Sequence, residues 1–358
     1  MKIADIGGEF ALIKRLTQKT CDDPVVVKGV GDDCAVLKYT DVSYLLVTVD
    51  MMVENDHFTL EWHSPYQIGY KLMEANVSDI IAMGGTPHWA FLSIALTPAT
   101  EVEFMDDFYR GLYASAESHG VNLIGGDTTH GPRNFCVTIF GEVESGCALR
   151  RSGARAGDEI WVSGRPGRAA MGLAHLQGRI RLDEPELSDC IAALQRPQPR
   201  VALGLALQGL ATAAIDVSDG LLADLGHILE ASGIAAQLKI AVPPAPTFAR
   251  DAWLAGGDDY ELVFTARATR HADIAALSQA LDLALTCVGR IEDGPAGRID
   301  LRDAEGTPMA APRRGYDHFM SLPEAGTVSP ADMSLPESGT VSLADMSPPE
   351  AGTASPDA

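Results

Sequence analysis

The spacing of apolar residues changes between helical and strand periodicity along the first 145 residues. Ile68, Leu72 and Ala75 recur near a 3.6-residue period after Pro65, a residue that favours helix starts, which predicts a helix from 65 to about 83. Two more helices are expected at 9–19 and 101–118. Runs rich in β-branched and aromatic residues predict strands at 25–30, 43–50, 88–96 and 135–144. A further strand, VNLI, is expected to run into a glycine-rich loop, GGDT.

A turn-rich segment, RSGARAGD, opens a second unit in which helices and strands alternate. We expect strands at 159–164, 212–216, 236–242 and 260–266, helices at 220–232 and 269–282, and a closing pair of strands near 285–302. Such alternation is typical of helices layered on a sheet. The sequence therefore predicts an α/β (α+β) fold with two domains, at residues 1–147 and 148–320.

The last 38 residues consist of a short repeat. SLPEAGTVSPADM, SLPESGTVSLADM and SPPEAGTASPDA follow one another and carry six acidic residues but no Lys or Arg. A segment so rich in Pro, Ser, Gly and Glu buries too little apolar surface to offset the entropy lost on ordering. We expect 321–358 to be a disordered acidic tail.

The composition is that of a globular protein with an acidic surface. Hydrophobic residues make up 46% of the chain, and the formal net charge is −22, which disfavours binding to nucleic acid or to an anionic membrane. The N-terminal residues have no apolar signal-peptide core, and no apolar run is long enough to span a membrane. The six cysteines form no CxxC pair, so a reducing, cytoplasmic location is expected.

Candidate chemistry is concentrated in aspartates that stand in glycine-bearing turns or at predicted strand ends. Glycine lets the backbone approach a ligand closely, and carboxylates from distant segments suit a hard cation such as Mg²⁺, which bridges to phosphate oxygens. No basic cluster accompanies them. These residues are Asp32, Asp33, Asp50, Asp79, Asp127, Asp216 and Asp219.

Each of these residues also has a structural explanation. Asp32 and Asp33 fit the polar tip of a hairpin, and Ser218 or Asp219 fits the cap of the helix expected from Gly220. Asp79 is harder to explain in this way, because it lies on an otherwise apolar helix where an unpaired charge is costly. His57 fits a substrate contact or a surface histidine equally well. The recurrence of acidic turns of one style favours a functional interpretation of the set.

Other nucleotide-binding and hydrolase motifs are missing. The sequence contains no GxxxxGK[ST] phosphate loop and no GxSxG nucleophile elbow. In GVGDDC, Cys34 stands where a dinucleotide-binding fingerprint requires its third glycine. A P-loop enzyme, a Rossmann oxidoreductase and an α/β-hydrolase are therefore disfavoured.

Eight motifs in fixed order give the chain a resemblance to thiamine-monophosphate kinases, which belong to the aminoimidazole-ribotide synthetase superfamily. The resemblance covers about residues 7–319. The motifs are GVGDDCAVL, TVDMMVENDHF, NVSDIIAMGGTP, LIGGDTTHG, RSGARAGD, IDVSDGLLADLGHI, GGDDYEL and GYDHF.

This resemblance implies a homodimer that forms through the N-terminal sheet, with ATP and thiamine monophosphate bound between the two domains. It implies several Mg²⁺ ions, held by the residues that match the family's metal ligands: Asp33, Thr48, Asp50, Asp79, Asp127, Asp216 and Asp219. It implies ATP contacts by Tyr109, Gly126, Asp127, Arg151 and Ser218. Contacts to thiamine monophosphate are implied for His57, Asp258 and Tyr316.

The expected reaction is direct γ-phosphoryl transfer from ATP to thiamine monophosphate, giving thiamine diphosphate in its biosynthesis. The acceptor is a phosphate monoester whose oxygen is already anionic, so no catalytic general base is expected. One alternative is another ATP-using member of the superfamily. The other is an inactive protein that binds nucleotide or thiamine phosphate.

Truncation after Leu322 is expected to leave the melting temperature and turnover nearly unchanged, because a polar, proline-rich tail contributes little buried area. Thermal melting and turnover of the full-length and truncated chains measure this. A large loss of either in the truncated chain would show that the tail packs on the folded part.

Overall fold

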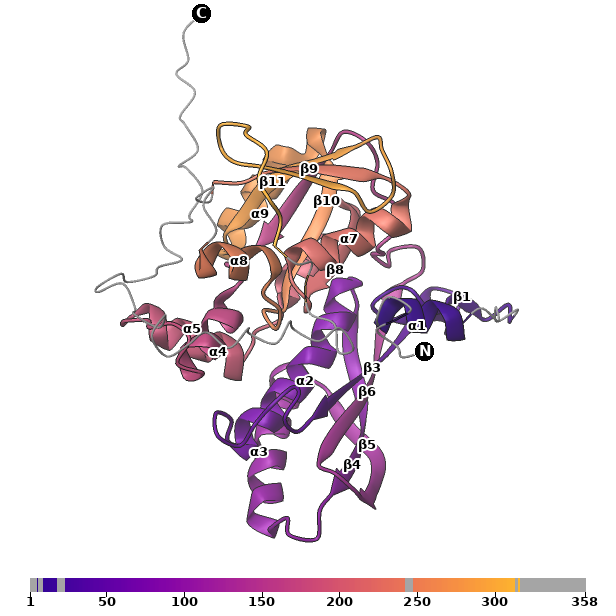
Figure 1. The fold of residues 1–358 in the computed structure, drawn as a ribbon. Helices are drawn as coiled ribbons and strands as arrows, with labels where there is room; N and C mark the ends of the chain where they lie inside the picture. The colour runs from indigo at the N-terminus through magenta and orange to yellow at the C-terminus, as the bar shows by residue number, and fades with distance from the viewer. Residues whose placement is uncertain (1–4, 6–8, 18–22, 242–246, 313–314, 316–358) are drawn as a thin grey trace, which may run out of the picture.

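Two six-stranded sheets, each with its own helices, make up the computed structural model (Figure 1). The structure describes residues 5, 9–17, 23–241, 247–312 and 315. The first sheet is built from residues 26–144 and the second from residues 158–302, which confirms the expected α/β (α+β) class. Tyr316 and the 321–358 tail lie outside the described residues, so their predictions stay predictions. Among the described helices, none has both the length and the apolar character that a membrane crossing needs.

The first sheet has the strand order β1-β2-β3-β6-β4-β5, in which β4 and β5 run parallel and the other neighbours antiparallel. Strand β3 and its neighbour β6 pair along their full length, from Ser43 to Val53 on β3. The six strands, β1 to β6, span Val26–Lys28, Ala35–Lys38, Ser43–Val53, Thr86–Leu96, Asn122–His130 and Asn134–Glu144.

The glycine-rich segment expected to be a loop is the middle of β5. Gly125 and Gly126 pair with Phe91 and Leu92 of β4. A Cβ atom at Gly126 would overlap the Leu92 backbone carbonyl, so the close pairing of these two strands requires glycine. The prediction of a loop was wrong because the same glycines that indicate a turn also permit a tight strand contact.

Two helices, α2 (Pro65–Ala82) and α3 (Val102–Ser118), cover one face of the first sheet (Figure 1). The Ser64 hydroxyl caps the first turn of α2. The helices pack closely because Gly69 and Gly111 have no Cβ; at each position a Cβ would overlap a carbonyl of the facing helix. Helix α2 also contacts β8 of the second sheet, which makes it a connection between the two halves.

The opposite face of the first sheet carries exposed apolar side chains. Val49 and Met51 on β3 are 57% and 51% exposed, Phe91 on β4 is 39% exposed, and Ile124 on β5 is 55% exposed. Val49 and Phe91 both pair with Thr138 of β6, so they share a row across the sheet. We call Val49, Met51, Phe91 and Ile124 the outer apolar face.

The second sheet has the strand order β12-β9-β11-β7-β10-β8. The two strands expected to close the fold as a pair both exist, but β9 lies between them: it pairs antiparallel with β11 and parallel with β12. Neighbours in sequence are therefore not neighbours in this sheet. The strands β7 to β12 span Asp158–Ser163, Ala211–Val217, Ala235–Lys239, Glu261–Arg267, Leu285–Glu292 and Ile299–Arg302.

Among the described residues, six α-helices accompany the second sheet, and one α-helix precedes the first sheet. Helix α7 follows β8 directly and packs against it, so residues at the end of β8 lie beside the start of the helix. The helices α1 and α4 to α9 span Glu9–Leu16, Arg168–Leu176, Glu186–Gln195, Val201–Ala206, Leu221–Ser232, Phe248–Ala255 and His271–Leu281.

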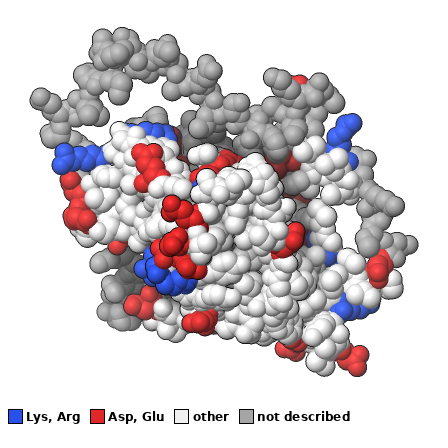
Figure 2. Space-filling view, turned by 90° about the horizontal axis from the view of Figure 1, so that it is seen from below, with Lys and Arg blue, Asp and Glu red and all other residues white. Residues whose placement is uncertain are grey.

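Charged side chains on the face seen from below form small separate groups, with large uncharged areas between them (Figure 2). On this face the described residues form no extended basic patch. The acidic side chains on this face are in keeping with the net charge of −22.

Candidate functional site

Three carboxylates from both halves of the chain meet in one place. Asp33 lies in the loop between β1 and β2, Asp79 on α2, and Asp216 near the end of β8. One oxygen of each lies within 4.8 Å of the oxygens of the other two. We call these three residues the aspartate cluster; the sequence predicted all of them as site residues, and the fold brings them together.

Each member of the aspartate cluster accepts a hydrogen bond from a nearby side chain. The Thr48 hydroxyl donates to Asp79 Oδ2 at 2.5 Å, and the Ser78 hydroxyl donates to Asp216 Oδ2 at 2.6 Å. Ser78 and Asp79 are adjacent on α2. This turn of the helix therefore contacts Thr48 in the first half and Asp216 in the second. These donors compensate part of the cost of burying the charges.

Arg151 joins the cluster from the segment that connects the two sheets. Its Nη2 and Nε donate to Asp33 Oδ1 at 2.6 and 3.1 Å, and its backbone N–H donates to Asp32 Oδ1 at 2.8 Å. Asp32 therefore positions the Arg151 backbone, while Asp33 pairs with its guanidinium. A hairpin tip exposed to solvent does not describe this pair, because Asp33 is only 7% exposed.

Crowding of carboxylates raises their pKa values. Burial, together with the nearby Asp33 carboxylate, raises the pKa of Asp216 to about 8. Burial and Asp33 also raise the pKa of Asp50, to about 6, and burial and Asp50 raise that of Asp79. Both causes oppose the charged forms, so the cluster favours the uptake of protons or of a cation.

The donor set of the cluster fits Mg²⁺. The second carboxylate oxygens of Asp32 and Asp33 are buried and have no hydrogen-bond partner in the described structure. Asp32 Oδ2 lies 3.8 Å from the Lys28 ammonium, whereas Asp33 Oδ2 is a buried acceptor that a hard cation with a preference for oxygen ligands would satisfy. Thr48 and Asp50 lie next to the cluster, so the residues present can hold such an ion.

Asp219 lies in a second acidic group rather than in the first. Its carboxylate lies within 4.8 Å of ligand atoms of Asp224 and His227 on α7. The sequence pointed to Asp219 or Ser218 as the cap of this helix, but α7 has no side-chain cap at its N-cap, Gly220. Asp224 instead accepts the backbone N–H groups of Asp219 and Gly220, at 3.2 and 3.0 Å. Sequence reasoning missed Asp224 and His227, although an Asp and a His at i, i+3 on one helix are a recognisable signal.

Asp127 is not brought to the aspartate cluster within this chain. It is exposed on the edge strand β5, and it pairs with Ser93, which is in the same row as Cys136 and Met51. At about 4.8 Å per strand, three strand spacings separate it from Met51 by about 14 Å. The register thus places Asp127 in the row of Met51 on the outer side of the sheet, with Gly126 beside it.

The remaining predicted residues lie on separate elements of the two halves. Tyr109 is half-buried on α3, and Ser218 accepts a 2.7 Å hydrogen bond from the Asp258 N–H through its backbone carbonyl. His57 follows β3, and its Nδ1 accepts the Val53 N–H at 3.1 Å.

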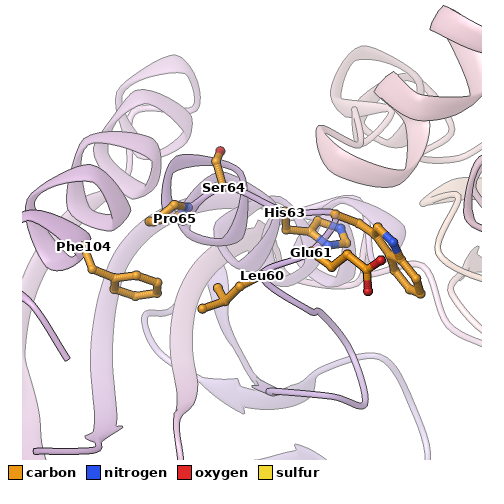
Figure 3. A pocket seen from close by; sticks show the side chains of 7 residues that line it. Leu60, Glu61, His63, Ser64, Pro65 and Phe104 are labelled. Atoms are coloured by element: carbon orange, nitrogen blue, oxygen red, sulfur yellow. The ribbon is translucent and has the colours of Figure 1, made fainter. Parts of the chain in front are cut away.

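An open pocket of about 350 Å³ lies at the N-terminus of α2. Leu60, His63 and Pro65 line one side and Phe104 of α3 the other (Figure 3). Burial, together with the Lys71 ammonium, lowers the pKa of His63 to about 4, although Asp258 acts against this. Lys71 and Asp258 thus act through their charges on His63, one of the residues that line the pocket. The sequence analysis did not single out this pocket, because its lining mixes apolar, aromatic and polar residues that form no recognisable motif.

Comparisons with known proteins identify the family of the chain. Residues 31–143 match the family model of the N-terminal domain of AIR synthase related proteins, and residues 155–302 match that of the C-terminal domain. The thiamine-monophosphate kinase of Salmonella typhimurium is 38% identical over 323 residues, which cover 87% of this chain and 98% of that protein. The Bacillus subtilis thiamine-monophosphate kinase is 34% identical, with 87% and 99% covered.

Solved structures show the same similarity. The crystal structure of thiamine-monophosphate kinase from Stenotrophomonas maltophilia has 40% sequence identity and a TM-score of 0.68, and covers 84% of this chain and 97% of that one. A structure described as AaThiL complexed with AMPPCP and TMP has 31% identity and a TM-score of 0.75, and covers 89% and 99%. A hydrogenase maturation protein HypE in complex with ATP, at 18% identity and a TM-score of 0.62, shares the fold alone.

The Asp216→Asn variant is expected to melt at an equal or higher temperature than the native chain when divalent cations are absent, because it removes one buried, repelled carboxylate. Mg²⁺ is also expected to raise the melting temperature of the variant by less than half as much as that of the native chain, because the affinity of the variant for Mg²⁺ is at least about tenfold lower. Thermal melting in EDTA and across a Mg²⁺ titration measures both effects.

Asp293→Asn is the matched control, because Asp293 is exposed in the turn between β11 and β12 and its replacement changes the net charge equally. This control should respond to Mg²⁺ as the native chain does. An unchanged Mg²⁺ response of Asp216→Asn would remove Asp216 from the candidate metal site.

Proposed function

The chain belongs to the thiamine-monophosphate kinase family of the AIR synthase related proteins, and we propose that it transfers the γ-phosphoryl group of ATP directly to thiamine monophosphate. The products are thiamine diphosphate and ADP, the transfer is in-line, and the reaction requires Mg²⁺. The structure of a relative is described as complexed with AMPPCP and TMP, and this description supports ATP and thiamine monophosphate as the substrates.

The observation that carries this proposal is the aspartate cluster at the junction of the two halves. Asp33 and Asp79 come from the first half and Asp216 from the second. A site formed by two domains can hold two anionic substrates end to end. The negative charge of the carboxylates attracts the cations that neutralise both phosphates. A binding site for a neutral ligand has no use for carboxylates buried against one another.

We assign the metal-binding role to the carboxylates and to one hydroxyl. When bound, Mg²⁺ would neutralise phosphate oxygens of both substrates and stabilise the charge on the transferred group. The proposed ligands are Asp33, Thr48, Asp50, Asp79, Asp127, Asp216 and Asp219.

The proposed contacts to each substrate come from both halves of the chain. ATP is assigned to Tyr109, Gly126, Asp127, Arg151 and Ser218, and thiamine monophosphate to His57, Asp258 and Tyr316. Arg151 is the fixed cation of the site. Its guanidinium is oriented by Asp33 and offers planar N–H donors to phosphate oxygens.

The mechanism needs no general base. The oxygen of a phosphate monoester is already anionic near neutral pH, so it attacks without losing a proton to the protein. The chain's residues orient two anions in line: Arg151 fixes one phosphate, and the Thr48 and Ser78 hydroxyls hold the Asp79 and Asp216 carboxylates in place.

We further propose that the chain is a homodimer formed through the outer apolar face. Its four large side chains are 39–57% exposed across three strands, more apolar surface than a monomer's sheet usually presents to water. Asp127 lies in the same row as Met51, so the interface would also cover the edge where this predicted ligand stands.

Met51→Glu is expected to shift the protein from dimer to monomer, because it places a charge at the centre of the buried apolar contact. Size-exclusion chromatography with light scattering measures the mass. Val42→Glu is the control, since Val42 is 72% exposed in the turn between β2 and β3. A native chain that is monomeric at micromolar concentration would contradict the proposal.

Thiamine monophosphate is expected to be phosphorylated with a kcat/KM at least about 100-fold higher than that of unphosphorylated thiamine, because the free alcohol lacks the charge that the site binds and meets no base. Coupled measurement of ADP release with each acceptor tests this. Comparable turnover of thiamine would indicate a hydroxyl kinase, and ADP release without any acceptor phosphorylation would indicate an ATPase.

A further inference from the structure

Lys71 is a buried cation on α2, one turn before Glu74, a buried carboxylate that lies 2.8 Å from His119 rather than pairing with Lys71. Its side chain is 2% exposed, and its neighbours Leu72 and Met73 are fully buried. A buried ammonium is costly unless it is paired and hydrogen-bonded. Its Nζ donates to Asp258 Oδ2 at 2.5 Å. This ion pair joins α2 of the first half to the loop before β10 in the second.

Asp258 is held in a conformation that an aspartate rarely adopts. Its φ is +73°, in the left-handed region, which is unfavourable for a residue with a Cβ and persists only where the surroundings enforce it. Its N–H donates to the Ser218 carbonyl at 2.7 Å, and a Cβ at the preceding Gly257 would overlap that same carbonyl. The loop is thus fixed against the end of β8, beside Asp216 of the aspartate cluster.

Both oxygens of the Asp258 carboxylate have partners, yet the side chain is still 37% exposed. Lys71 occupies Oδ2, and the Tyr260 hydroxyl donates to Oδ1 at 3.2 Å. Each oxygen has a further lone pair to offer. Because the pair with Lys71 is neutral overall, the carboxylate presents hydrogen-bond acceptors at a fixed place rather than a net negative charge.

The spacing along α2 relates this carboxylate to the phosphate end of the site. Lys71 and Asp79 are eight residues apart on the helix, about 12 Å at 1.5 Å per residue. An extended phosphate ester that carries two linked aromatic rings has the same order of length. With its phosphate at the aspartate cluster, the far ring reaches the level of Lys71, Asp258 and the pocket lined by His63.

We propose that Lys71 is a positioning residue that fixes the Asp258 carboxylate so that it accepts a hydrogen bond from the exocyclic amine of the pyrimidine ring of thiamine monophosphate. This inference rests on the proposed function and adds to it the group that selects the organic part of the acceptor. Lys71 acts through Asp258 and does not take part in phosphoryl transfer.

The test compares thiamine monophosphate with oxythiamine monophosphate, in which an oxygen replaces the pyrimidine amine; in its stable keto form this oxygen accepts hydrogen bonds and donates none. The native chain is expected to prefer thiamine monophosphate at least about tenfold in kcat/KM, since an unpaired polar group in a specific site is costly. Lys71→Met is expected to raise the KM for thiamine monophosphate at least about tenfold, to leave the KM for ATP within about twofold, and to reduce the preference to below about twofold.

The double variant Lys71→Met/Asp258→Asn is expected to be no worse than Asp258→Asn, because one residue acts through the other. Lys239→Met, an exposed position on β9, is the matched control and should keep the native preference. Lys71→Gln, which keeps a donor without the charge, replaces Lys71→Met if the latter does not fold.

Four outcomes are informative in different ways. Retention of the native preference in both Lys71→Met and Asp258→Asn would overturn the inference, as would a native chain that does not discriminate between the two acceptors. A lower melting temperature with unchanged KM values would show a merely structural ion pair and would overturn it too. Absence of any thiamine monophosphate phosphorylation by the native chain would instead overturn the proposed function.

Discussion

The burial of several carboxylates at one point is the constraint on which the other features of this structure depend. Asp33, Asp79 and Asp216 bring oxygens within 4.8 Å of one another, and burial and mutual repulsion raise the pKa of Asp216 to about 8. Left alone, such a group opposes folding. The hydroxyls of Thr48 and Ser78 offset part of that cost, and a bound cation would offset the rest. The site is therefore costly to build, and this cost supports the proposal that it binds cations.

Helix α2 links the aspartate cluster to the second half of the fold. Its C-terminal half carries Ser78 and Asp79 to the cluster, and Lys71, two turns earlier, reaches Asp258 in the other half. The glycines at its crossing with α3 let it lie close to its neighbour. Because one helix contacts both the aspartate cluster and the loop before β10, the distance between these two contacts is set by helical geometry rather than by flexible loops.

Local patterns predicted the elements of this region well and their partners less well. The helix expected at 65–83 is α2, and Asp79 stood out because a charge on an apolar helix needs a reason. The segment GGDT was mistaken for a loop, since glycine signals both turns and close strand pairing. The closing strands were expected to pair with each other, but β9 lies between them, and sequence order says little about sheet order when connections cross over.

By itself, the sequence determined the α/β (α+β) class, the family, the acidic surface and which aspartates were candidates, because composition, periodicity and motif order are local properties of the chain. Only the tertiary structure decided which of them meet. It joined Asp33, Asp79 and Asp216 across 183 positions of sequence, set Asp219 beside Asp224 and His227, and left Asp127 on the outer side of the sheet. It also gave Lys71 a partner. Contacts between residues so far apart arise when the two halves pack, and no local pattern encodes the distance between two side chains that different sheets hold in place.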